Sequence, residues 1–243
     1  RHPNITQEQG NEEDEEDTDA EEGHIEFNFQ HNNETINNID EWKESDSEKE
    51  CTSSIWHLNI RSLRKHKRDL EIFIHKVRPD IMVITEAGIE EAEIDQYVQT
   101  GYDLRNNLRV NRKGGGIIIY VKETFEISES QPLKTAHMEA LTATIKKINT
   151  GASFRLAAIY RPPDTKRRLF LEELEEICES IGHAPAVITG DTNINTRNEN
   201  DTFATEYANL MAQYGFLNCI QGITREVVRK NRLAKSCLDH IWI

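Results

Sequence analysis

The sequence predicts an α/β fold, specifically a four-layer sandwich in which two β-sheets pack together with helices outside. Residues 55–60 and 80–85 have the composition of buried strands and flank a helical stripe of apolar residues, which predicts a parallel strand pair with a helical crossover. Residues 117–160 predict a run of strands without helices, and residues 186–189 predict a strand between two amphipathic helices. Two strand-rich halves, each with helices, therefore predict two packed sheets.

Apolar patterning sets the elements of the first half. Apolar residues at helical spacing follow the strand at 55–60 as far as Val77, and Pro79 predicts the end of that helix. Residues 102–105 predict a short strand. Gly114, Gly115 and Gly116 precede a strand at 117–121. Since neither a Lys-Ser/Thr pair nor a helix follows them, these glycines predict close backbone approach and not a nucleotide-binding loop.

The second half alternates strands and helices. Strands are predicted at 125–128, 139–148 and 153–160, with the last two forming an antiparallel hairpin that Pro162 and Pro163 end. Residues 166–181 predict a helix with an acidic outer face, and residues 202–214 predict a second helix closed by Gly215. Between them lies the strand at 186–189, after which Gly190 predicts a turn. Residues 217–220 and 238–243 predict extended chain, joined by a basic loop at 224–235.

The charge distribution divides the chain into a tail and a domain. Residues 1–50 hold 18 acidic and 3 basic side chains, which leaves the remainder nearly neutral. Few large apolar residues interrupt the acidic run, so residues 1–53 are expected to be a disordered tail and residues 54–243 one domain. No leader and no run of about 18 apolar residues is present, so neither secretion nor a membrane span is expected. The four cysteines lack Cys-x-x-Cys spacing, which disfavours a disulfide framework and a zinc site.

Polar side chains stand at the ends of several predicted strands. These residues are Asn59, Glu86, Tyr160, Asp191, Asn193 and Asp239. Taken singly, each is better explained as a turn, capping or packing residue. Together they offer carboxylate and amide oxygens without a His or Cys cluster, which selects a hard cation such as Mg²⁺ or Mn²⁺. Cleavage of phosphate esters is the chemistry that most needs such a set.

Basic side chains gather in three groups on this nearly neutral domain. The groups lie at residues 61–68, 166–168 and 225–235. Such patches fit a polyanionic partner, although exposed helix faces and loops carry basic residues by default.

A series of short motifs, in order, carries a family resemblance. The motifs are Leu58-Asn59-Ile60-Arg61-Ser62-Leu63, Ile84-Thr85-Glu86, Ile159-Tyr160-Arg161-Pro162-Pro163, Gly190-Asp191-Thr192-Asn193 and Ser236-Cys237-Leu238-Asp239-His240-Ile241. Residues 54–243 resemble the endonuclease/exonuclease/phosphatase superfamily. Within it, they are most similar to the apurinic/apyrimidinic-type endonuclease domain of LINE-like, non-LTR retrotransposons.

The resemblance implies a role for each matching position. Glu86 corresponds to the principal Mg²⁺ ligand, with Asn59 beside it. Asp191 corresponds to the residue that aligns or deprotonates water, and Asn193 and Tyr160 to donors to the phosphate. The remaining assignments are Asp239 as the carboxylate that orients a catalytic His, Glu139 as a structural residue, and Arg61, Asn195, Thr224 and Arg225 as DNA-binding positions.

One departure from the family pattern concerns that catalytic His. In the family it lies in a Ser-Asp-His motif on a further strand, and the sequence ends before such a motif. His240 follows Asp239 directly, but adjacent strand residues face opposite ways, so His240 is expected to be structural. The sequence is therefore expected to lack a C-terminal strand and to be weak or inactive as a fragment, since loss of such a group removes about 10²- to 10⁴-fold in rate.

The resemblance implies a Mg²⁺-dependent DNA endonuclease that nicks target DNA for retrotransposon insertion. It also implies a reverse transcriptase domain in the full-length product and action in the nucleus, with a cytoplasmic location as the other possibility. Two alternatives stay open at this point. One is a phosphodiesterase or phosphatase of the same fold acting on a non-DNA substrate, and the other is a degenerate, non-catalytic relic.

Overall fold

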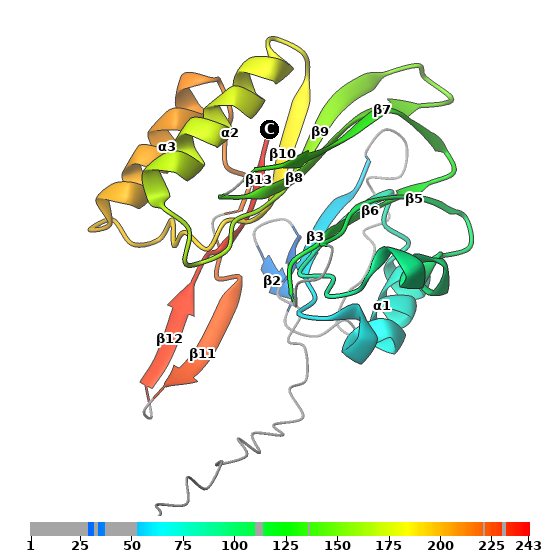
Figure 1. Ribbon diagram of the computed structural model, residues 1–243, viewed down its shortest axis with the longest axis horizontal. Helices are drawn as coiled ribbons and strands as arrows, with labels where there is room; N and C mark the ends of the chain where they lie inside the picture. Colours follow the sequence, from blue (N-terminus) through cyan, green and yellow to red (C-terminus); the bar gives the residue numbers. More distant parts are fainter. Residues whose placement is uncertain are drawn as a thin grey trace, which may run out of the picture.

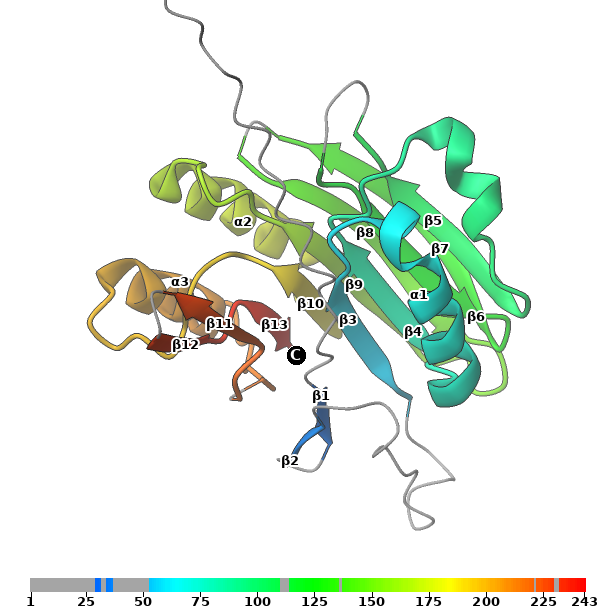
Figure 2. The same ribbon diagram turned by 90° about the horizontal axis from the view of Figure 1, so that it is seen from below.

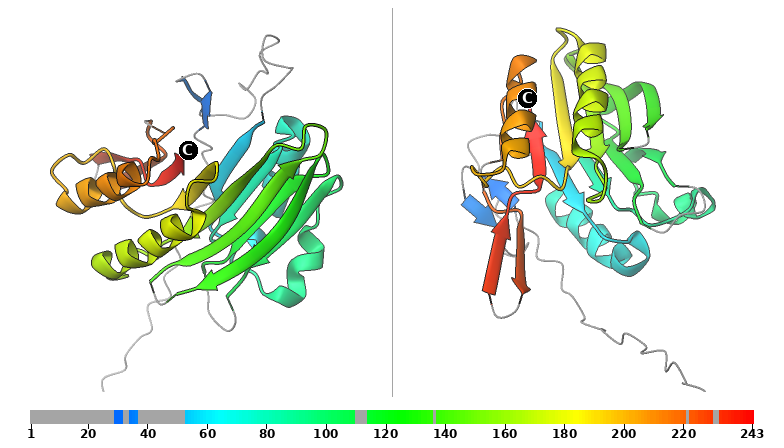
Figure 3. Two further views of the ribbon diagram at one scale, coloured as in Figure 1. Left: turned by 90° about the horizontal axis from the view of Figure 1, so that it is seen from above. Right: turned by 60° about the vertical axis from the view of Figure 1, so that its left-hand side comes forward.

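Two β-sheets pack face to face between outer layers of helices, which confirms the predicted sandwich (Figure 1). The computed structural model describes residues 29–31, 34–36, 53–109, 114–135, 137–220, 222–229 and 232–243. Figure 3 shows the layers from two sides, with α2 and α3 over one sheet and α1 over the other.

The first sheet has four strands. Their order is β3 (Ile55–Asn59), β4 (Ile81–Thr85), β6 (Ile117–Lys122) and β5 (Tyr102–Asn107). β3 and β4 are parallel, as predicted, and α1 (Leu63–Val77) crosses between them. Every residue of β4 is buried because its alternate side chains face α1 on one side and the second sheet on the other.

The second sheet has five strands. Their order is β13 (Asp239–Trp242), β10 (Ala186–Asp191), β9 (Ser153–Tyr160), β8 (Glu139–Lys147) and β7 (Phe125–Lys134). β8 and β9 form the predicted antiparallel hairpin, and β10 runs parallel to β9. Two helices, α2 (Arg167–Ile181) and α3 (Thr202–Gln213), cover its outer face. Figure 2 shows the strands between α2 and α3 on one side and α1 on the other.

Three apolar clusters hold the layers together. The cluster between the sheets includes Val83 and Ile119 from one sheet and Leu141 and Leu156 from the other. The two outer clusters lie under α1 and under α2 and α3. Because β3 and β10 meet through the inner layer, strand ends from different sheets come to one edge of the molecule.

Gly190 differs from its prediction as a turn residue. It lies inside β10, opposite Ile159 of β9 and His240 of β13. A Cβ atom there would overlap the carbonyl oxygen of Ile159, and its φ is +153°. Glycine is therefore required for the close approach of β9 to β10, and the strand continues to Asp191.

The basic loop predicted at 224–235 is instead a hairpin. β11 (Arg225–Arg229) pairs antiparallel with β12 (Arg232–Ser236), and Figure 1 shows the pair extending away from the sandwich. Val228 and Leu233 are opposite each other in this hairpin and are largely exposed, so no buried face marked these strands in the sequence. The 3₁₀ helix η2 (Glu91–Tyr97) was also not predicted.

Most of the acidic tail predicted to be disordered lies outside the described residues. Its described parts are β1 (Phe29–His31) and β2 (Glu34–Ile36), which pair antiparallel with each other, and residue 53. Across the part of the chain that the structure describes, no helix has the length and apolarity needed to cross a membrane.

Candidate active site

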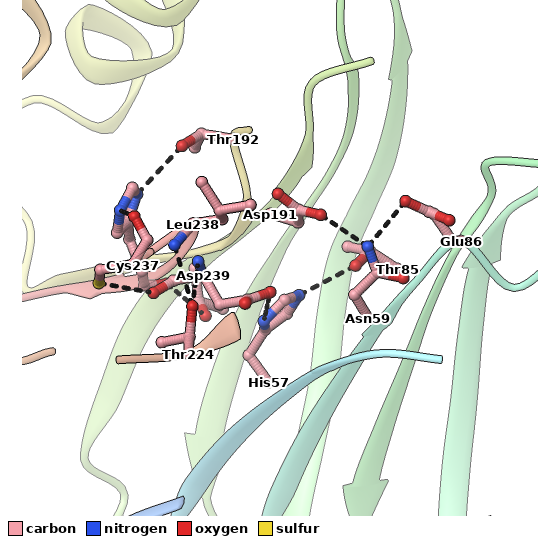
Figure 4. Close-up of polar contacts among 12 residues, drawn as sticks. His57, Asn59, Thr85, Glu86, Asp191, Thr192, Thr224, Cys237, Leu238 and Asp239 are labelled. Carbon is pink, nitrogen blue, oxygen red and sulfur yellow. Dashed lines mark hydrogen bonds and ion pairs between the residues drawn. The ribbon is translucent and has the colours of Figure 1, made fainter. Parts of the chain in front are cut away.

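Asn59, at the end of β3, joins two carboxylates that the sequence predicted to converge. Its Nδ2 donates to Glu86 Oε1 at 2.7 Å and to Asp191 Oδ2 at 2.6 Å. Figure 4 shows Asn59 between these two side chains. The amide therefore links the ends of β3, β4 and β10, and so joins the two sheets.

The turn that follows β4 fixes Glu86. Glu86 has a left-handed backbone, with φ of +53°, which is uncommon for a residue other than glycine. Backbone hydrogen bonds surround it, because its carbonyl accepts from Ser62 and the next residue, Ala87, donates to Gly116. These bonds stabilise a conformation that would otherwise cost on the order of 1 kcal/mol.

Asp191 is held by its own loop as well as by Asn59. Its Oδ1 accepts the backbone N–H of Asn193 at 2.8 Å. Asn193 has φ of +51°, so the backbone turns at this residue, and the Asn193 amide donates to the carbonyl of Arg161 at 2.9 Å. Burial raises the pKa of Asp191, although the bonds from Asn193 and Asn59 partly oppose that change.

The side chain of Asp239 faces a histidine that the sequence analysis missed. Nδ1 of His57 lies 3.3 Å from Asp239 Oδ1, and neither atom has a hydrogen-bond partner among the described residues. On its other side, His57 Nε2 lies 3.1 Å from Thr85 Oγ1 (Figure 4). Burial lowers the pKa of His57 to about 3, so the ring is neutral, and burial together with the charge of Asp191 raises the pKa of Asp239.

His240 has the structural position expected for it. It is 1% exposed and faces away from Asp239, with Nδ1 3.1 Å from Thr192 Oγ1 and 3.3 Å from the hydroxyl of Tyr207. Burial lowers its pKa to about 4. His240 therefore packs against the loop that follows Asp191, through its contact with the Thr192 hydroxyl.

One row of the five-stranded sheet carries most of the predicted residues. In the strand register, Asp239 is opposite Asp191, Asp191 is opposite Tyr160, and Tyr160 is opposite Glu139. Residues directly opposite in neighbouring strands point to the same face of a sheet, so this row lines one face of the site. Burial and the charges of Glu86 and Asp191 raise the pKa of Tyr160, so its phenol stays protonated and can donate.

The predicted DNA-binding residues occupy different environments. Thr224 Oγ1 accepts the backbone N–H groups of Leu238 and Asp239, and thereby positions the start of β13. Asn195 Oδ1 accepts the backbone N–H groups of Arg197 and Cys237, so this atom stabilises the conformation of its own loop. Arg61 is exposed, and Arg225 is partly buried at the start of β11.

The donor chemistry at this edge fits a hard divalent cation. Glu86 and Asp191 offer carboxylate oxygens, and Asn59 offers its amide Oδ1, which accepts the backbone N–H of Arg61 at 3.2 Å. Burial, together with the charge of a neighbouring carboxylate, raises the pKa of Asp191 and of Asp239, and a cation would offset that negative charge. Within the described ranges no group of three His, Cys, Asp or Glu side chains could hold a metal by itself.

Sequence comparison places these residues in a known family. The model of the Endonuclease/Exonuclease/phosphatase family matches residues 55–243. A probable RNA-directed DNA polymerase from transposon BS of Drosophila melanogaster is 25% identical over 114 residues, which are 46% of this chain and 12% of that protein. The chain thus spans only a small part of this relative's length.

Structure comparison gives the same fold. The endonuclease domain of TRAS1, a telomere-specific non-LTR retrotransposon, has a TM-score of 0.60 at 15% identity, covering 79% of this chain and 84% of that one. A mannosyl-6-phosphatase of Bacteroides thetaiotaomicron, Bt3783, has a TM-score of 0.59 at 15% identity, covering 79% and 85%. The chain is a member of the Endonuclease/Exonuclease/phosphatase family.

Proposed function

We propose that this chain is a Mg²⁺-dependent DNA endonuclease domain that nicks target DNA during retrotransposon insertion. The observation that carries the proposal is the meeting of Asn59, Glu86 and Asp191 at one amide nitrogen, where the ends of strands from both sheets come together. Asn59 and Glu86 would hold the Mg²⁺ or Mn²⁺ ion. Such an ion, when bound, neutralises charge on the phosphate oxygens.

The chain's own residues then have separate roles. Asp191 orients the attacking water and accepts its proton, a role that its raised pKa favours because a base works best near the operating pH. Asn193 and the protonated phenol of Tyr160 donate to the phosphate as negative charge develops. Asp239 and His57 do not need to touch the substrate, since they fix the end of β13 against β3 beneath these groups.

Two features favour DNA as the substrate. The β11–β12 hairpin extends from the edge of the site and carries Arg225, Arg229, Arg232 and Lys235 in its sequence. A basic hairpin of this kind suits the phosphate backbone of a duplex. The similarities to a transposon polymerase and to a retrotransposon endonuclease domain also support DNA, an associated reverse transcriptase and nuclear action.

Nicking of supercoiled plasmid in Mg²⁺ tests the proposal. Glu86→Ala and Asp191→Ala should each reduce the rate by at least about 10²-fold. Glu172→Ala, which removes a carboxylate on the outer surface of α2, should leave the rate unchanged. A version extended by a strand with a Ser-Asp-His motif should nick faster.

Other outcomes would favour the alternatives. Phosphate release from sugar, lipid or nucleotide esters without nicking would support a phosphatase of the same fold, as in Bt3783. If neither the chain nor its extended version cleaves any ester and Mg²⁺ fails to bind at Glu86, the domain is a non-catalytic relic.

A further inference from the structure

We propose that Arg109 binds a backbone phosphate of the DNA next to Tyr160. The inference rests on the proposed function and deepens it, because it adds a residue to the substrate-binding surface. Arg109 follows β5 and reaches the row of site residues at its Glu139 end, where its Nε forms an ion pair with Glu139 Oε1. The guanidinium thereby extends a row that is otherwise formed by Asp239, Asp191, Tyr160 and Glu139.

Three contacts hold the guanidinium in place. Glu139 is itself fixed, because its Oε2 accepts the backbone N–H of Gly116 at 2.6 Å. The Cζ atom of Arg109 lies 5.8 Å from the centre of the Tyr160 ring, which is within the range of a cation–π contact. Gly115 packs against both charged groups, and a Cβ atom there would overlap the guanidinium of Arg109 and come within 2.7 Å of Glu139 Oε1. The absence of a side chain at Gly115 is therefore what makes room for the pair.

The two Nη groups of Arg109 can donate hydrogen bonds to a ligand. Among the residues described, Nε bonds to Glu139 and neither Nη has a hydrogen-bond partner. Arg161 is different, since its Nη1 and Nη2 donate to the carbonyls of Thr192 and Thr165, and the residue is 3% exposed. The side chain of Arg109 is 26% exposed, so its Nη groups are accessible from solvent.

A phosphate is the ligand that matches these groups. The guanidinium fork can donate two parallel hydrogen bonds to phosphate oxygens. The neighbouring carboxylates, Glu86 and Asp191, would repel a phosphate, so a cation beside Tyr160 favours its entry. The phosphate is assigned to a nucleic-acid backbone because the basic β11–β12 hairpin leads into β13 at the Asp239 end of the row, and one polymer can reach both ends.

Metal-free binding of a labelled DNA duplex tests the inference apart from catalysis. Fluorescence anisotropy in EDTA, between 50 and 200 mM salt, would compare wild type, Arg109→Met, Arg109→Lys and Arg155→Met. Arg155 is the matched control because it is exposed, its Nη1 donates to the Ser180 carbonyl, and it lies near the start of β9, at the other end of that strand from Tyr160. Arg109→Met should weaken binding about tenfold and reduce the slope of log affinity against log salt by about 0.9, the value for one lost phosphate contact.

The conservative variant separates charge from geometry. Arg109→Lys keeps the charge and should keep the wild-type slope, but its affinity should fall several-fold because Lys lacks the fork. Arg155→Met should match wild type in both measurements. If Arg109→Met and Arg109→Lys bind like wild type and only lower the melting temperature, Arg109 is a structural clamp and the inference is overturned. If wild type binds DNA with the expected Arg109 dependence but neither it nor the version extended by a Ser-Asp-His strand nicks DNA, the proposed endonuclease activity is overturned and the Arg109 assignment stands. Failure of wild type to bind DNA overturns both.

Discussion

Replacing Asn59 by Ala should destabilise the metal-free protein in a strongly pH-dependent manner. The Asn59 amide donates to both Glu86 and Asp191, and no other side chain described in the structure bonds to both carboxylates. Without the Asn59 amide, the carboxylates of Glu86 and Asp191 face each other with no hydrogen-bond donor between them. The variant therefore measures what the amide contributes to holding the site together.

The distances set the size of the effect. The two acceptor oxygens lie within roughly 5.3 Å of each other because both touch one nitrogen, and at an effective dielectric constant of about 20 their repulsion is about 3 kcal/mol. In the wild type two charge-assisted hydrogen bonds, of about 1.5 to 3 kcal/mol each, oppose this repulsion. Asp191 is 3% exposed and cannot recover its bond from water, whereas Glu86 is half-buried and can do so in part. The expected loss in the free energy of unfolding is about 3 kcal/mol.

Protonation removes most of that loss. The Asn59 hydrogen bond lowers the pKa of Asp191, so its removal raises that pKa further, and the native state of the variant binds a proton more readily. Urea denaturation in EDTA should therefore show the full loss at pH 8 and less than about 1 kcal/mol near pH 4.5.

Asn107→Ala provides the matched control. The Asn107 amide donates to two neutral acceptors, the carbonyls of Ala140 at 2.7 Å and Leu133 at 3.2 Å. Its removal should destabilise the protein equally at both pH values. An Asn59→Ala variant with the same loss at pH 4.5 as at pH 8, or with no loss at pH 8, would refute the role assigned to the amide.

Three further predictions concern stability. Ser62→Gly should stabilise the protein by about 1 kcal/mol and so raise its melting temperature, because Ser62 has φ of +117°, a backbone conformation that is strained for any residue except glycine. An unchanged or lower melting temperature would contradict this. Gly190→Ala should cost more than about 4 kcal/mol, measured by urea denaturation or by loss of soluble protein, because its Cβ would overlap the Ile159 carbonyl, and a cost below 1 kcal/mol would contradict the register of β9 and β10. The metal-free wild type should lose stability as pH rises above about 4, because burial raises the pKa of Asp239 and the native state keeps a proton that the unfolded state has released. Asp239→Asn should reduce that slope between pH 5 and pH 8 in urea denaturation, and an identical slope would show that Asp239 does not cause it.

Local patterning accounts for most of the elements that the sequence predicted. β4 and α2 were predictable because an unbroken apolar run and a helical stripe each reflect burial on specific faces. The β11–β12 hairpin was not, because within the described residues its strands pair with each other and leave Val228 and Leu233 exposed. Gly190 was assigned to a turn because the sequence does not show how closely β9 approaches β10.

The residues of the site also divide into those that the sequence predicts and those that only the structure reveals. Asn59, Glu86 and Asp191 were predictable as polar residues at strand ends, which parallel pairing brings to one edge. His57 has a signal that was overlooked, since it lies two residues before Asn59 and so shares its face of β3. Arg109 lies in a connection after β5, and only the strand register that brings Glu139 opposite Tyr160 shows its place.

The bond between Asn59 and Asp191 also has a consequence for folding. It joins residues 132 apart in the chain, from strands of different sheets. Closing so long a loop has an entropic cost that is recovered only when the whole inner layer has packed, so contacts of this kind form late. Helices and hairpins can appear from local sequence, whereas the carboxylates and the amide meet only when the two halves dock. During refolding, cation binding at this edge should therefore lag behind the recovery of secondary structure.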